Sequence, residues 1–247
     1  MKIGIIGFGA IGRFLAQNLG DEVLWVVDCD PAARKRLLKL KLECGFFPSL
    51  PEKCGGAELV VEAASQQAVP ILEKCLSHSD VMILSVGALS DDALLGRLIF
   101  AAEKNNRKIY VPSGAIGGLD AIGAAARVMN GMLLETVKPP SSLGRDDAAR
   151  TIVFEGSARQ AVKLFPKNVN VSATLALAGI GFDRTKVRVV SDPAVKKNMH
   201  RVTVDSGAGK MIFEFENVPF EENPKTSKLA AMAALERIRK IGRALQV

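Results

Sequence analysis

A glycine-rich turn between an apolar run and an apolar helical segment limits the fold of this chain more than any other feature. Residues 2–6 are mostly apolar, G-F-G-A-I-G follows at 7–12, and residues 13–19 have apolar positions at helical spacing. In this pattern the first glycine makes a tight turn, the second lets the backbone approach a pyrophosphate, and the third lets helix and strand pack closely. Backbone N–H groups and the positive end of the helix dipole favour phosphate there. The pattern predicts a dinucleotide-binding turn whose contact residues are Gly7, Gly9, Ala10, Ile11 and Gly12.

An acidic residue follows the next apolar run. Residues 23–27 predict a buried strand, and Asp28 comes directly after it, at the place where an acid binds the adenosine ribose hydroxyls. Asp28 favours NAD. Arg34 and Lys35 could accommodate the 2′-phosphate of NADP, or could form the solvated face of the next helix. Asp30 is also available as the acid, so the sequence leaves this residue and the choice between NAD and NADP open.

Strand and helix signals continue to alternate up to residue 111. Residues 59–63, 81–84 and 108–111 predict strands, and residues 68–76 and 91–104 predict helices. This alternation indicates a Rossmann-type, doubly wound parallel sheet, in which ligands lie at the carboxyl ends of the strands. Small side chains follow these strands and leave room for a flat cofactor. The expected contacts there are Ala63, Ala64, Ser85 and Val86.

The pattern changes after a second glycine-rich stretch, V-P-S-G-A-I-G-G-L-D at 111–120. Period-two alternation over 187–190, 201–204 and 211–215, with a hairpin turn at 206–209, predicts strands of an α+β unit with a mainly antiparallel sheet. A helix expected over 120–129 and a strand over 133–137 precede them. A final helix over 224–244, begun by Asn223-Pro224, is expected to return to the first domain. We therefore predict a dinucleotide domain of residues 1–114 completed by 223–247, and a catalytic domain of residues 115–222.

His200 is the best candidate for a proton carrier. It shares strand parity with Val202 and Val204, so its side chain is expected on the apolar face of the strand. A histidine in such a place is more often a core residue than a catalytic one. If the protein moves a proton near neutral pH, however, His200 is a better candidate than His78, which lies in a polar turn.

Polar residues open an otherwise apolar helix at 164–179. Asn168 or Asn170 could cap this helix, or these residues together with Lys167 could form a site for an anion or a carboxamide. The residues alone do not decide between the two.

Four segments in order, 111–120, 165–172, 198–200 and 222–227, together resemble the L-aspartate dehydrogenase family across essentially the whole chain. The resemblance implies an NAD(P)-dependent amino-acid dehydrogenase that deaminates L-aspartate oxidatively, through iminosuccinate, to oxaloacetate and ammonia. It also implies a role in supplying iminosuccinate to NAD biosynthesis and a homodimer formed through the second domain.

The resemblance also assigns residues. His200 matches the catalytic histidine of the family, and Ala115 and Asn168 match positions that contact the cofactor near its nicotinamide end. Lys167, Asn170 and Thr226 lie in matching motifs, and by extension we expect them to bind the substrate carboxylates. The stretch at 111–120 is then a junction between the two domains, and its glycines allow close backbone approach to the nicotinamide.

Composition excludes several other classes. The four cysteines form no C-x-x-C pair and the chain has two histidines, so neither a metal site nor a disulfide framework is expected. The net charge of +7 is scattered, which favours small anionic ligands over nucleic acid. No apolar run approaches the roughly 20 residues of a membrane span and no signal peptide is evident, so a cytoplasmic protein without a membrane partner is expected.

Two alternative functions remain. The chain could be a related two-domain NAD(P)-dependent oxidoreductase that acts on another amino or oxo acid. It could also be a non-catalytic dinucleotide-sensing regulator that uses its basic charge on DNA, although no helix-turn-helix segment accompanies the fold.

Overall fold

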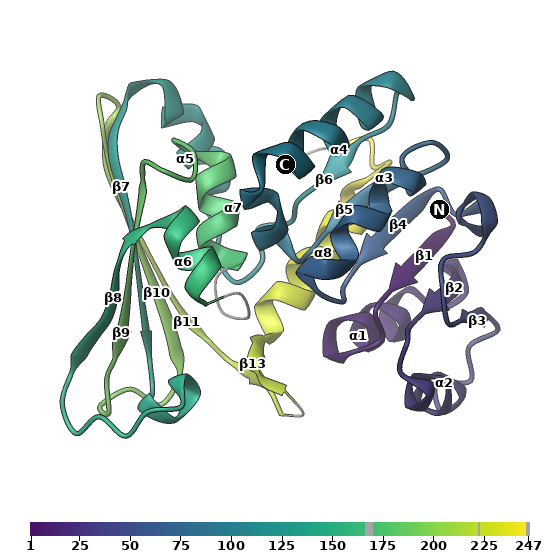
Figure 1. Ribbon diagram of the computed structural model, residues 1–247, viewed down its shortest axis with the longest axis horizontal. Helices are drawn as coiled ribbons and strands as arrows, with labels where there is room; N and C mark the ends of the chain where they lie inside the picture. The colour runs from purple at the N-terminus through teal and green to yellow at the C-terminus, as the bar shows by residue number, and fades with distance from the viewer. Residues whose placement is uncertain (166–169, 222, 246–247) are drawn as a thin grey trace. The chain divides into compact units, whose positions relative to one another are not determined.

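The protein is described from a computed structural model (Figure 1), which describes residues 1–165, 170–221 and 223–245. Its internal contacts form two compact units. Unit 1 consists of Met1–Pro112 and Ala234–Val247, and unit 2 consists of Ser113–Ala233. The sequence predicts borders after residue 114 and before residue 223. The second predicted border precedes the last helix, whereas the border between the two units lies within that helix. The division into a dinucleotide domain and a catalytic domain stays a prediction.

Unit 1 is built on a six-stranded parallel sheet in the order β3-β2-β1-β4-β5-β6. The strands are β1 (Ile3–Ile6), β2 (Val23–Val27), β3 (Gly45–Phe47), β4 (Leu59–Glu62), β5 (Asp80–Ile83) and β6 (Ile109–Tyr110). Strands β2 and β3 are added on one side of β1, and β4, β5 and β6 on the other, so the strand order reverses between β1 and β4. Dinucleotides bind at this point in this topology. The predicted doubly wound parallel sheet is therefore confirmed.

The helices of unit 1 differ from the prediction at one place. They are α1 (Ala10–Leu19), α2 (Pro31–Leu38), α3 (Leu72–Cys75) and α4 (Asp92–Lys104). The helix predicted over 68–76 is instead a 3-10 turn, Gln66–Ile71, followed by the single turn of α3. Pro70 lies inside this turn and has no N–H group to donate to an α-helical hydrogen bond.

The last helix, α8 (Lys228–Lys240), contributes to the core of unit 1 with its second half. Ala234, Leu235 and Ile238 belong to the same buried cluster as residues of β1, β2, β4, α1 and α2. The predicted start at Asn223-Pro224 is wrong, because 223–227 form the strand β13 (Asn223–Ser227). Ser227 Oγ accepts a hydrogen bond from the Leu229 N–H group at 3.1 Å, and the helix begins there.

Unit 2 is built on a five-stranded sheet in the order β11-β10-β7-β9-β8. The strands are β7 (Met129–Lys138), β8 (Thr151–Ser157), β9 (Thr185–Ser191), β10 (Asn198–Ser206) and β11 (Gly209–Asn217). In this sheet the pairs β10–β11, β10–β7 and β8–β9 are antiparallel and the pair β7–β9 is parallel. The predicted mainly antiparallel sheet is therefore confirmed, with one parallel pair. A small two-stranded ribbon pairs β13 with β12 (Pro219–Phe220).

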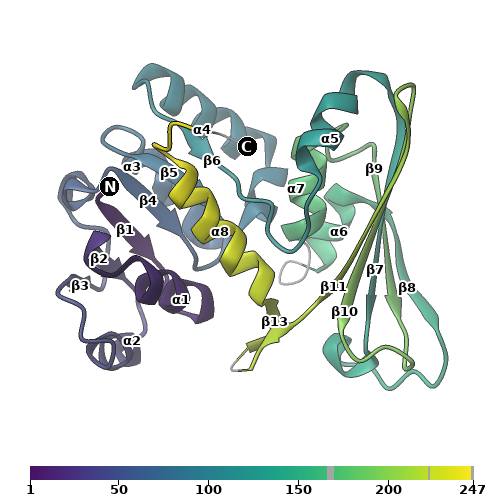
Figure 2. The same cartoon turned by 180° about the vertical axis from the view of Figure 1, so that it is seen from behind.

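Helices cover one face of the unit 2 sheet, as Figures 1 and 2 show from opposite sides. They are α5 (Leu119–Ala125), α6 (Ala158–Leu164) and α7 (Asn170–Ala178). The helix predicted over 120–129 ends early, because a 3-10 turn at Ala126–Val128 leads into β7, which begins at Met129. Along β10 burial alternates, and His200, Val202 and Val204 are buried together. The predicted orientation of His200 on the apolar face is therefore confirmed.

Candidate cofactor and catalytic sites

The glycine loop of unit 1 combines two crowded glycines with one open glycine. Gly7 has a φ of +95°, and a Cβ atom there would lie 2.7 Å from the Ala63 backbone. A Cβ at Gly12 would lie 2.0 Å from the Gly7 carbonyl oxygen, whereas a Cβ at Gly9 would meet nothing within 4 Å. Helix α1 begins at the next residue, so the open space lies at its N-terminus. This space suits an anionic group such as a pyrophosphate, which the helix N-terminus stabilises.

The structure separates the two acids that follow β2. The half-buried Asp28 accepts hydrogen bonds from the Phe8 N–H group at 2.7 Å and from the Asp30 N–H group at 2.8 Å. Its carboxylate is therefore held against the glycine loop. Asp30 instead caps α2, where it accepts from the Ala32 N–H group and pairs with Arg36. These two contacts hold the pKa of the Asp30 carboxyl below its usual range. Of these two acids, Asp28 is thus the one beside the glycine loop.

A buried glutamate organises the turns after β4 and β5. Glu62 is fully buried; its Oε1 accepts from the Ala64 N–H group and the Ser85 hydroxyl, each at 2.8 Å, and its Oε2 accepts from the Ser85 N–H group at 2.9 Å. Burial raises the pKa of Glu62, although these hydrogen bonds oppose the shift. The turns carry four of the predicted cofactor contacts: Ala63, Ala64, Ser85 and Val86. Sequence reasoning missed Glu62; its signal is an acid that ends an otherwise apolar strand.

His200 lies on β10, opposite Thr136 of β7. Its side chain is 6% exposed, and its Nδ1 atom lies 3.0 Å from Thr136 Oγ1, within hydrogen-bonding distance. Burial, with a smaller contribution from the positive charge of Lys138, lowers the pKa of His200 to about 4. The imidazole is therefore neutral at physiological pH and able to accept a proton. In the tautomer whose Nδ1–H group donates to Thr136 Oγ1, this contact fixes the ring and leaves Nε2 as the proton acceptor.

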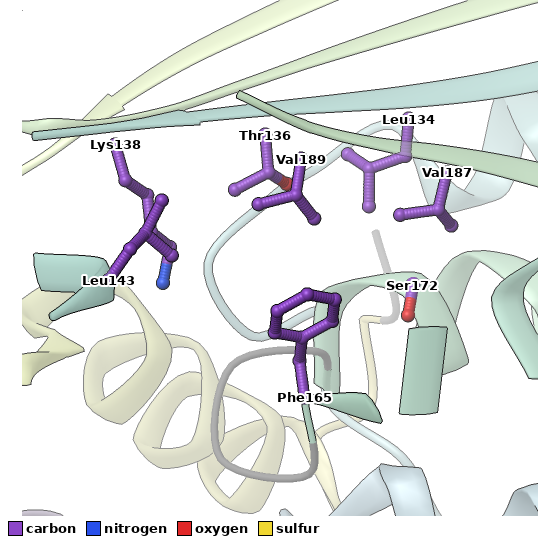
Figure 3. A pocket seen from close by; sticks show the side chains of 8 residues that line it. All are labelled: Leu134, Thr136, Lys138, Leu143, Phe165, Ser172, Val187 and Val189. Atoms are coloured by element: carbon purple, nitrogen blue, oxygen red, sulfur yellow. The ribbon is translucent and has the colours of Figure 1, made fainter. Parts of the chain in front are cut away.

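A small cavity lies beside Thr136, between the sheet and the helices of unit 2 (Figure 3). Its volume is about 10 Å³, enough for one water molecule. Eight residues line it: Leu134, Thr136, Lys138, Leu143, Phe165, Ser172, Val187 and Val189. Figure 3 shows side chains of β7 and β9 pointing from the sheet toward Phe165 and Ser172.

The turn at Ala115 is held by a second residue that sequence reasoning missed. The buried Asn217, at the end of β11, donates a hydrogen bond from Nδ2 to the Ala115 carbonyl oxygen at 3.0 Å. Its Oδ1 accepts from the Ser227 hydroxyl at 3.1 Å. Gly114 and Gly118, on either side of Ala115, have positive φ angles of 69° and 73°. The backbone of this turn is therefore fixed from within unit 2.

The predicted substrate residues Lys167, Asn170 and Thr226, and the predicted cofactor contact Asn168, are only partly described. Lys167 and Asn168 lie outside the described residues. Asn170 is the exposed first residue of α7, and Thr226 lies on β13, where its Oγ1 accepts a hydrogen bond from Asn223 Nδ2 at 3.0 Å. The roles of these four residues stay predictions.

Two further findings concern the described residues, 1–165, 170–221 and 223–245. Within these ranges, no three histidine, cysteine or acidic side chains come together as a set of metal ligands. No helix in the same ranges is both long enough and apolar enough to cross a lipid bilayer. Cys29, Cys44, Cys54 and Cys75 are free thiols.

The fold and the site define a two-domain NAD(P)-dependent oxidoreductase. Residues 120–241 match the family model described as "Aspartate dehydrogenase, C-terminal", and residues 3–112 match "Homoserine dehydrogenase, NAD binding domain". An L-aspartate dehydrogenase from Methanosarcina barkeri is 39% identical over 268 residues, which cover 100% of this chain and 99% of the relative. One from Thermotoga maritima is 36% identical over 248 residues, with 98% and 97% covered. The chain belongs to the L-aspartate dehydrogenase family.

Solved structures agree with this assignment. The crystal structure of an aspartate dehydrogenase from Thermotoga maritima matches with a TM-score of 0.87 at 31% identity, covering 100% of this chain and 99% of that one. A hyperthermophilic archaeal homoserine dehydrogenase matches with a TM-score of 0.60 at 14% identity, which shows a shared fold alone. The resemblance seen in the sequence is confirmed.

Proposed function

We propose that this protein catalyses the NAD(P)-dependent oxidative deamination of L-aspartate. L-Aspartate and the oxidised cofactor give iminosuccinate, the reduced cofactor and a proton; water then converts iminosuccinate to oxaloacetate and ammonia. One observation carries the proposal: a buried, neutral histidine held by Thr136 in a chain whose full-length relatives are named L-aspartate dehydrogenase.

The cofactor-binding residues belong mainly to unit 1. We assign the pyrophosphate to the glycine loop, with Gly7, Gly9 and Gly12, and the adenosine ribose to Asp28. Ala63, Ala64, Ser85 and Val86 would line the path of the cofactor, with Ala115 and Asn168 near the nicotinamide. When bound, the nicotinamide accepts the hydride from the substrate Cα. Arg34 and Lys35 are exposed on α2, so the structure allows either NAD or NADP.

His200 is assigned the proton transfer. Its Nε2 atom would take a proton from the substrate amine, or from the water that hydrolyses the imine, because Nδ1 is engaged with Thr136. A positioned general base of this kind contributes roughly 100- to 10,000-fold to the rate. Lys167, Asn170 and Thr226 remain candidates for binding the substrate carboxylates.

The remaining parts of the proposal concern context. We propose a cytoplasmic homodimer formed through unit 2, in which case the face of its sheet away from His200 is the first candidate for the interface. The exposed Ile152 and Ile212 lie on that face, as strand register and parity require. Supply of iminosuccinate to NAD biosynthesis is a further part of the proposal. Light scattering after size-exclusion chromatography tests the dimer, and an Ile212→Lys variant should weaken it.

A cofactor-reduction assay tests the central proposal. Purified protein with L-aspartate and either NAD or NADP should form reduced cofactor, seen by its near-ultraviolet absorbance, between pH 7 and pH 10. Other amino acids should react more slowly, and a better substrate among them would favour the related oxidoreductase instead. Failure to reduce either cofactor with L-aspartate, when cofactor binding has been demonstrated, would contradict the proposal.

A further inference from the structure

Lys138 is a buried cation on the helix-covered face of the unit 2 sheet. It is the last residue of β7, and the period-two alternation of a strand places it on the same face as Leu134 and Thr136. Its exposed fraction is 5%, low for a lysine. Figure 3 shows its side chain extending from the sheet beside Leu143. The ammonium group is therefore at the cavity and not at the outer surface of the unit.

The cavity gives this charge an unusual setting. Leu134, Leu143, Phe165, Val187 and Val189 supply apolar walls, and Thr136 and Ser172 supply hydroxyl groups. Among the eight described lining residues, Lys138 is the only charged one. An ammonium group in apolar surroundings interacts strongly with an anion, because little water is present to screen the interaction. The cavity is thus suited to a carboxylate that brings hydrogen-bond acceptors with it.

Lys138 is also close to the proposed base. Thr136, whose hydroxyl contacts His200, precedes Lys138 by two residues on the same face of β7, a separation of about 7 Å along a strand. His200 responds to the charge of Lys138, which lowers its pKa in addition to burial. Lys138 and His200 are therefore both neighbours of Thr136 on one face of the sheet, Lys138 two residues along β7 and His200 across from it on β10.

We propose that Lys138 binds one carboxylate of the dicarboxylic substrate and so holds the amine-bearing carbon near His200. This inference rests on the proposed function, because it concerns the substrate of the same site. It adds a residue of β7 to the substrate-binding residues expected from the sequence, Lys167, Asn170 and Thr226. A cavity for one water molecule is too small for aspartate. Substrate entry therefore requires its walls outside the sheet, Leu143, Phe165 and Ser172, to move.

Three variants test the proposal. Lys138→Met removes the charge and keeps most of the side-chain length, Lys138→Arg keeps the charge, and Lys186→Met makes the same change at an exposed lysine of the neighbouring strand β9. Steady-state kinetics give KM and kcat for L-aspartate. Calorimetry gives the affinity for succinate, an unreactive dicarboxylate, in the presence of cofactor.

Lys138→Met should raise the KM for L-aspartate by about 10- to 100-fold, as expected for loss of a hydrogen bond between charged groups. It should weaken succinate binding by a similar factor and leave the Kd for the cofactor within about twofold. Lys138→Arg should retain part of the affinity, and Lys186→Met should resemble the wild type. The acid limb of the kcat/KM profile should move to higher pH in Lys138→Met, because the pKa of His200 rises when the nearby cation is removed. The shift of this limb reports the loss of positive charge near His200, whereas the KM and the succinate affinity report the contact between Lys138 and the carboxylate.

The outcomes separate this inference from the proposed function. A folded Lys138→Met protein with wild-type KM and wild-type succinate affinity overturns the role of Lys138, even if L-aspartate is the substrate. If the wild type does not oxidise L-aspartate but binds succinate, and Lys138→Met loses that binding, the site stands and the proposed function falls. A wild type that neither oxidises L-aspartate nor binds succinate contradicts both. Lys138→Gln is a second neutral variant if Lys138→Met does not fold.

Discussion

The proposed phosphate site of unit 1 is made of backbone groups, whereas the proposed catalytic site of unit 2 contains buried ionisable side chains. In the glycine loop, Gly7 and Gly12 fill places where a Cβ would collide with the backbone, and Gly9 leaves open the space proposed for the phosphate. On the sheet of unit 2, His200 and Lys138 are 6% and 5% exposed. The glycine loop depends on the absence of side chains, whereas the site of unit 2 depends on the protonation states of His200 and Lys138.

This difference has consequences for what each unit contributes. Backbone N–H groups keep their hydrogen-bonding character at every pH in the physiological range, so the glycine loop can bind phosphate without titrating. A buried imidazole has a pKa set by its surroundings, and the free energy of unfolding depends on pH through it. Changes in unit 1 should therefore alter cofactor affinity and stability, whereas changes around His200 should alter the rate and its pH dependence.

Removal of the base in unit 2 should have the largest effect. His200→Ala should lower kcat with L-aspartate by about 100- to 10,000-fold, because the proposed proton acceptor is lost. Cofactor affinity, measured by fluorescence titration, should stay within about twofold. His78→Ala, at an exposed histidine of unit 1, is the control and should keep wild-type kinetics. A His200→Ala protein with full activity would remove histidine from the mechanism while the fold assignment stood.

The pH dependence of stability should differ between His200 and a neutral replacement. The pKa of His200 is about 4 in the folded protein and 6.5 in the unfolded chain, so the unfolded chain binds the additional proton between these values. Stability from neutral His200 is thus fully present above pH 6.5 and is lost as the pH falls toward 4. Relative to His200→Gln, the wild type should lose about 3 kcal/mol of unfolding free energy over this window. Urea denaturation of both proteins at a series of pH values measures this, and parallel curves would show that the histidine is not buried as described.

Two glycines of unit 1 should respond differently to the same substitution. Gly12→Ala places a Cβ 2.0 Å from the Gly7 carbonyl oxygen, and a backbone atom cannot move away cheaply, so we expect a loss of about 1–3 kcal/mol in unfolding free energy. Gly9→Ala meets no protein atom within 4 Å and should leave stability nearly unchanged. Its methyl group occupies the proposed phosphate space, so the Kd for the cofactor should rise by about tenfold or more. Equal effects of the two changes on stability would contradict the geometry of the loop.

The two units also differ in how much of them the sequence could predict. The strand, loop and helix at the start of unit 1 are local, and each depends on residue types that are next to one another in the chain. The parity of His200 was predictable for the same reason, since alternation along β10 is a local pattern. Strand β8 was not predicted, because burial along it does not alternate cleanly and its sequence carries no period-two signal.

The residues that organise the sites were missed because their partners are distant. Glu62 binds Ser85, 23 positions later, and Asn217 binds Ala115, 102 positions earlier. Lys138 is followed by two prolines in the sequence and resembles a surface lysine at the end of a strand. Only the packing of the helices on the sheet shows that it is buried. Local sequence patterns thus predicted most strands and helices of each unit. The residues that position the proposed ligands became visible only from tertiary contacts.

The smallest effect should separate two neighbouring acids of unit 1. Asp28→Asn replaces a carboxylate that accepts hydrogen bonds from Phe8 and Asp30 by an amide that can accept on one side only. We expect the Kd for NAD to rise by about tenfold, as for the loss of one charge-assisted hydrogen bond, with a smaller change for NADP. Asp30→Asn is the matched control, because asparagine caps a helix as well as aspartate and should leave both Kd values unchanged. Fluorescence titrations of both variants with each reduced cofactor measure the effect. A larger effect at Asp30 than at Asp28 would assign the ribose to the helix cap, and the acid of this unit would then act from α2 and not from the end of β2.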